Sequence, residues 1–136
     1  MPSVIAAILE SRTFLVLARV ELTFVFWSSG LAKLFGFDGA TLEMEKFHLQ
    51  PSWLFAVATV IVLLGGSLAI ILNRGVWLGT GALAVFTLLT IPIAHAFWNK
   101  TGDDAFQHMV ISFEHVSMVG GLALAAILSK RMRTKS

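Results

Sequence analysis

The sequence predicts an all-α protein, an integral membrane four-helix bundle that forms a single transmembrane domain over residues 1–136. Three observations support this prediction. Only 13% of the residues are charged, against roughly 25% in soluble domains, and 57% are hydrophobic. The mean hydropathy is +0.82. Residues 47–73 and 75–99 contain no Asp, Glu, Lys or Arg, and each stretch exceeds the roughly 20 residues that cross a bilayer core.

The first apolar segment lies at residues 13–34 and contains two ionisable side chains. Arg19 is near enough to the expected cytoplasmic edge to reach it, whereas Glu21 lies deeper and is expected to face inward as a neutral, hydrogen-bonded group. Both residues are therefore predicted to be buried polar groups. Residues 1–12 are expected to form a short interfacial helix.

The second and third spans are expected at residues 53–72 and 76–98. Pro51 suits the first turn of the second span, because its missing N–H has no helical partner at that position. Asn73, Arg74 and Gly75 predict a tight turn between the two spans, since Asn and Gly tolerate a positive φ. Pro92 lies inside the third span, where it is expected to bend the helix and free a carbonyl.

The fourth span is expected at residues 108–129, followed by a basic tail. Six of the ten basic residues lie near Arg12, near Arg74 or in the stretch from Lys130 to Lys135. Basic residues collect on the cytoplasmic side of membrane proteins, so both termini are predicted to be cytoplasmic. This distribution is typical of a membrane flank and argues against a nucleic-acid partner. The lipid bilayer is the expected surrounding. Stripes of small residues on the helices are also compatible with a homodimer.

Four ionisable residues from three spans are expected in one layer of the outer half of the bundle. They are Lys33, His95, Glu114 and His115. A carboxylate at the depth of Glu114 needs a cation, and Lys33 is the basic residue expected to reach it. With aromatic walls from Trp27, Phe97 and Phe113, this layer is predicted to line a pocket for a lipophilic ligand. A packed ion-pair network without a cavity is the alternative.

No catalytic residue can be named from the sequence, and no metal site is expected. The absence of cysteine excludes thiol redox chemistry, disulfides and cysteine-ligated clusters. Any redox role would therefore use a bound cofactor.

Several motifs, in this order, resemble the DoxX family of small four-helix bacterial membrane proteins. They are Arg19, the stretch from Ser29 to Lys33, Gly36-Phe37-Asp38-Gly39, Gly65-Gly66, His95 with Trp98, and Gly120-Gly121. The stretches 98–103 and 112–121 look most like the YphA-type branch, known as inner-membrane proteins. The resemblance implies a bundle in the bacterial cytoplasmic (inner) membrane and carries over Arg19, Lys33 and His95.

The resemblance also implies a redox setting, because some relatives are quinone-side subunits or parts of membrane-associated oxidoreductase complexes. The first hypothesis is thus a redox-accessory subunit that binds a quinone, with an oxidoreductase of the membrane or periplasm as partner. A quinone's carbonyl oxygens would need donors such as His and Lys. The second hypothesis is a non-catalytic scaffold for a partner enzyme. Haem between His95 and His115 is the weakest alternative, since no recognised ligand spacing is present.

Overall fold

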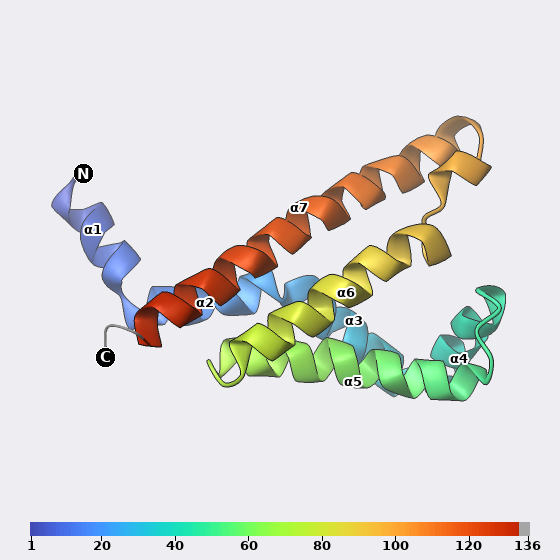
Figure 1. The fold of residues 1–136 in the computed structure, drawn as a ribbon, viewed down its shortest axis with the longest axis horizontal. Coiled ribbons are helices and arrows are strands. Elements are labelled where there is room, and N and C mark those ends of the chain that lie inside the picture. The colour runs from blue at the N-terminus through green and yellow to red at the C-terminus, as the bar shows by residue number, and fades with distance from the viewer. Residues whose placement is uncertain (134–136) are drawn as a thin grey trace.

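The computed structural model describes residues 1–133, and in that range the chain is helical without strands (Figure 1). The part of the basic tail that includes Lys135 lies outside this range. The elements in chain order are α1 (Ser3–Glu10), α2 (Arg12–Leu22), α3 (Phe24–Phe35), α4 (Phe37–Lys46), α5 (Ser52–Ile71), α6 (Val76–Ala94), the 3₁₀ helix η1 (Phe97–Asn99) and α7 (Gly102–Arg133).

Three segments are long and apolar enough to cross a membrane: α5, the stretch Val76–Asn99 and α7. Helix α5 has 20 residues, which span about 30 Å at 1.5 Å per residue. Helices α2 and α3 qualify only as a pair and are bent by 55° at the break between them. The protein is therefore an all-α membrane protein whose described residues contain three candidate spans, or four if the bent pair is one span.

The first span was expected as one helix, but the structure breaks it at Thr23. The Thr23 hydroxyl donates to the Arg19 carbonyl at 2.7 Å and approaches the Val20 carbonyl at 3.3 Å. The indole Nε1 of Trp27 also donates to the Val20 carbonyl, at 3.2 Å. Side chains thus bond carbonyls of the last turn of α2, which lets the chain bend inside an apolar segment.

The segment after α3, expected as a loop, contains helix α4, which folds back against α5. Ala40 and Met44 lie one turn apart on α4 and are buried with Ala56 of α5 in a small core. Asp38 in the first turn and Lys46 in the last turn have the charges that suit the helix dipole. This short helix brings charged side chains beside the apolar spans.

The turn between α5 and α6 forms as expected, with Asn73 at φ 56° and Gly75 at φ 65°. Beyond it the two helices approach very closely. A Cβ at Gly79 would lie 2.8 Å from the Gly66 carbonyl oxygen and 3.0 Å from the Ala69 Cβ. Glycine at position 79 therefore permits the contact between the two backbones.

The third and fourth spans differ in length from the expected ranges. Helix α6 ends at Ala94, two residues after Pro92, and the chain continues through η1. Pro92 thus lies in the last turn of α6 rather than kinking a helix that runs on to residue 98. Helix α7 begins at Gly102, six residues before the predicted span, and extends to Arg133.

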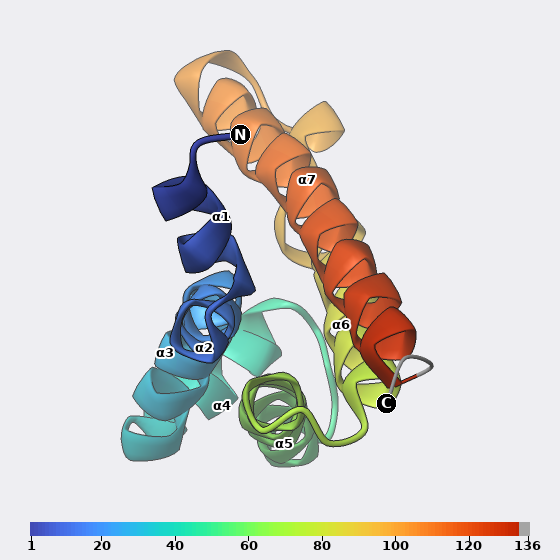
Figure 2. The ribbon, with the colours of Figure 1, turned by 90° about the vertical axis from the view of Figure 1, so that its left-hand side faces the viewer.

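The spanning helices pack tightly at one end and spread apart at the other. One core joins Phe26 of α3, Leu63 of α5, Leu83 of α6 and Leu122 of α7. Figure 1 shows α5, α6 and α7 fanning out toward the end that holds α4, η1 and the start of α7, which we call the loop end. Figure 2 shows the α1–α3 segment on the left, α6 and α7 together on the right, and α5 at the bottom between them. The opposite end, which we call the turn end, holds the α5–α6 turn and the end of α7.

Candidate functional site

A cavity of about 650 Å³ lies where the helices spread apart at the loop end. Its walls come from α3, α4, α5, α6 and α7, and from Lys100 in the connection between η1 and α7. Its size falls within the roughly 300–1,000 Å³ of small-molecule sites. Most of the lining is apolar, including Phe47, Phe55 and Phe86.

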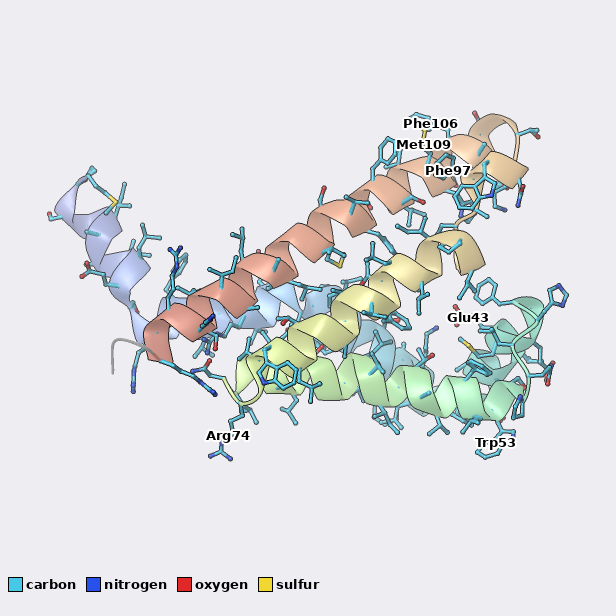
Figure 3. The ribbon with its side chains drawn as sticks, viewed as in Figure 1. Glu43, Trp53, Arg74, Phe97, Phe106 and Met109 are labelled. Carbon is cyan, nitrogen blue, oxygen red and sulfur yellow. The ribbon has the colours of Figure 1, made fainter. Side chains whose placement is uncertain are left out.

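One polar group of the cavity is the ion pair between Lys33 of α3 and Glu43 of α4. The side chains are 18% and 41% exposed, so the pair is only partly shielded from the surroundings. Figure 3 shows Glu43 on the side of α4 that faces the spanning helices. An ammonium group has three N–H donors, so Lys33 can bond Glu43 and still donate to a ligand.

Three histidines form the other polar group of the cavity. The Nδ1 atoms of His95 and His108 are 2.9 Å apart, and the rings of His95 and His115 are in edge contact with centroids 5.2 Å apart. Nδ1 of His115 is buried and has no hydrogen-bond partner within residues 1–133. His95 follows the end of α6, while His108 and His115 lie two turns apart on one face of α7.

These contacts bring Lys33, His95 and His115 to one cavity, as the depth argument predicted, but the structure corrects the expected role of Glu114. Glu114 is exposed on α7 and is not among the lining residues, and Lys33 pairs with Glu43 instead. Glu114 and His115 are adjacent and thus about 100° apart around the helix. His115 faces the cavity, and this angle turns Glu114 away from it.

The expected aromatic walls are also wrong: Trp27, Phe97 and Phe113 do not line the cavity. Trp27 supports the break between α2 and α3. Phe97 packs edge-on against Trp98 at 5.2 Å and Phe113 at 6.5 Å, outside the cavity at the loop end (Figure 3). Phe113 is 60% exposed. The aromatic surface of the cavity comes from other phenylalanines.

Sequence reasoning missed Glu43, Lys100 and the three lining phenylalanines as cavity residues. One signal was available for α4. Phe37, Ala40, Met44 and Phe47 follow a helical spacing and predict an amphipathic helix packed on a span. Glu43 precedes Met44 on that helix, so it lies at the edge of the packed face.

Arg19 and Glu21 were both predicted to be buried, and the structure buries only Arg19. Arg19 is buried and donates to the Asn73 side-chain oxygen at 2.9 Å, and the same oxygen accepts a bond from Ser129 at 3.1 Å. Figure 3 shows Arg74 at this end, far from Glu43. Glu21, expected to be buried, is exposed on α2. Arg19 therefore links α2 to the α5–α6 turn and to α7.

The geometry bears on metal and haem chemistry. In the described part of the chain, no group of three or more His, Cys, Asp and Glu residues has the arrangement of a metal site. A haem held between His95 and His115 would need room for the porphyrin between the two rings. The rings touch each other, so the hypothesis of axial haem ligation by this pair does not fit.

The fold and cavity define a small multi-pass helical membrane protein with an apolar cavity near one end. Residues 14–96 match the family model of DoxX, and the chain belongs to the DoxX family. It is similar to inner membrane protein YphA of Escherichia coli (strain K12), with 31% identity over 117 residues that cover 83% of this chain and 81% of that protein. No solved structure gave a significant match.

Proposed function

We propose that the cavity binds a quinone or a similar lipophilic ring with two acceptor oxygens, and that the protein acts as an accessory subunit of a membrane redox enzyme. The main support for this proposal is that two groups of hydrogen-bond donors line one apolar cavity. Lys33 contributes from α3, and the histidines contribute from the end of α6 and from α7. Apolar walls suit a ring that partitions into lipid, while the donors would orient its oxygens.

His115 places another imidazole ring at the cavity wall. Its Nδ1 atom is buried without a hydrogen-bond partner in the described residues, which costs about 1–3 kcal/mol. His95 has a partner in His108 but contacts His115 only through its ring. A ligand in the cavity can therefore contact the ring of His115 but not its buried Nδ1 atom.

The test is binding of a short-tailed quinone to the purified full chain in nanodiscs, followed by tryptophan quenching and calorimetry. Lys33→Met should weaken binding about 10-fold to 150-fold, since a bond from a charged donor is worth about 1.5–3 kcal/mol. His95→Ala should weaken it about 2-fold to 10-fold, as expected for a neutral bond. Phe113→Ala is the matched control, because Phe113 is exposed outside the cavity. Absent binding, or equal affinity in all variants, would refute the proposal.

A second candidate function is a non-catalytic scaffold, and the exposure of α7 favours it. Only 11% of the apolar window of α7 is buried, against 39% for α5. Glu21 and Glu114 are exposed on spanning segments, where a carboxylate is costly against lipid. A partner helix or second copy covering α7 would remove that cost. Cross-linking from a cysteine introduced at Ser117 should then give a defined product, whereas one introduced at buried Leu122 should not.

We also propose that the protein lies in the bacterial inner membrane with both termini in the cytoplasm. The turn end holds Arg12, Arg74 and the described part of the basic tail, while the acidic residues of α4 and of the start of α7 lie at the loop end. The loop end would then face the periplasm. A reporter active only in the periplasm should be active when inserted after Gly102 and silent at the C-terminus.

A further inference from the structure

Three side chains lead from the cavity to the surface at the loop end. His95 lines the cavity and meets His108 through facing Nδ1 atoms at 2.9 Å. His108 Nε2 in turn lies 3.4 Å from a carboxylate oxygen of Asp104, whose side chain is 60% exposed. The three residues thus join the cavity to the surface.

The contacts of His108 are those of a group that passes protons on. A neutral imidazole has one N–H donor and one acceptor nitrogen, so it can receive a proton on one nitrogen and release another from the second. His108 uses both nitrogens, one toward His95 and one toward Asp104. A hydrogen bond between the two facing Nδ1 atoms requires a proton on one and a free lone pair on the other, so this pair shares one proton.

Helix geometry explains why Asp104, His108 and His115 share a direction. Positions 104 and 108 are one turn apart on α7, and positions 108 and 115 are two turns apart. His95 comes from the other side, because it follows the end of α6 at Ala94 and meets His108 of α7. The Ser112 hydroxyl approaches the carbonyl of His95 at 3.4 Å, which helps to hold that residue against α7.

We propose that His95, His108 and Asp104 form a proton relay between the cavity and the water at the loop end. A proton from water enters at Asp104 and passes to His108 Nε2, while the Nδ1 proton of His108 moves to Nδ1 of His95. His95 then releases a proton from its other nitrogen into the cavity. Each group gains one proton and loses one, and no electron moves along the path. The proton's final acceptor, an oxygen of the bound ring, rests on the proposed function.

Other charged groups face this path. Lys100 lines the cavity and donates to Asp104 at 3.0 Å, so Asp104 is shared between Lys100 and His108. Lys33 and Glu43 line the cavity from α3 and α4 and neutralise each other in their ion pair. The lining residues of α5 carry no ionisable side chain. The aqueous entry therefore lies at Asp104, with Lys100 holding the carboxylate at the mouth.

The test measures exchange of histidine ring N–H protons with water in the full chain without ligand, by NMR of ¹⁵N-histidine-labelled protein in nanodiscs. His108→Gln keeps a hydrogen-bonding side chain but cannot receive a proton on one nitrogen and release it from another. It should slow exchange at His95 at least tenfold. Asp104→Asn, which keeps the shape of the side chain, should slow it severalfold. His48, exposed near the end of α4, is the control and should exchange at its wild-type rate.

The outcomes separate the relay from ligand binding. An unchanged exchange rate at His95 in folded Asp104→Asn and His108→Gln proteins would overturn the relay. If His108→Gln does not fold, Asp104→Asn alone decides the question. Quinone binding is measured in wild type and in Asp104→Asn, since Asp104 does not line the cavity. Slowed exchange without any quinone binding would uphold the relay and refute the proposed ligand. Intact binding with unchanged exchange would refute the relay alone.

Discussion

Replacing Gly79 by alanine tests the close packing of α5 and α6. The added Cβ would meet the Gly66 carbonyl oxygen at 2.8 Å and the Ala69 Cβ at 3.0 Å, both below the 3.4 Å at which ordinary contact begins. The first obstacle is backbone, which cannot rotate away as a side chain can. The two helices would have to separate by about 0.6 Å, and overpacking of this kind costs about 1–3 kcal/mol.

Gly81→Ala is the matched control, because it lies on the same helix and a Cβ there meets nothing within 4 Å. Alanine in place of glycine favours a helix by up to about 1 kcal/mol, so Gly81→Ala should stabilise the protein slightly. The Gly79 variant receives the same benefit but bears the packing cost. The difference between the two variants in the free energy of unfolding should therefore be about 1–3 kcal/mol.

The assay is unfolding in mixed micelles with increasing SDS, followed by tryptophan fluorescence and circular dichroism. Both variants should remain helical, and the midpoint should fall for Gly79→Ala relative to Gly81→Ala. Equal midpoints would show that a Cβ at position 79 does not collide with the Gly66 carbonyl oxygen, and the packing argument would fail.

Three further predictions concern the polar side chains, and the same SDS titration checks each of them. Arg19→Met should lower the free energy of unfolding by about 1.5–3 kcal/mol, because it removes a charged donor from the Asn73 oxygen, and an unchanged midpoint would contradict this. Lys33→Met and Glu43→Gln should couple by at least about 0.5 kcal/mol in a double-mutant cycle, whereas additive effects would mean that the ion pair contributes nothing. Glu114→Leu should leave the free energy of unfolding within about 0.5 kcal/mol of the wild-type value or raise it, because Glu114 is exposed. A decrease of about 3–5 kcal/mol would instead support the pairing of Glu114 with Lys33 that the sequence predicted.

The sequence determined the membrane character, the long apolar helices and the shared layer of Lys33, His95 and His115. Composition and charge-free length decide whether a segment can cross a bilayer, and both are read directly from the chain. The depth of a residue in the membrane also follows from its position in the sequence, because each helical residue advances about 1.5 Å along the span. Residues on different spans can therefore be placed in one layer before their contacts are known.

Only the tertiary structure decided which side chains of that layer face one another. The depth of a residue does not determine how its helix is rotated about its own axis. Glu114 and His115 are adjacent in the sequence, yet Glu114 is exposed while His115 faces the cavity. The partner of Lys33 comes from α4, whose place against α5 depends on contacts between segments distant in the chain. The break at Thr23 likewise depends on side-chain bonds to backbone carbonyls that an apolar pattern does not reveal.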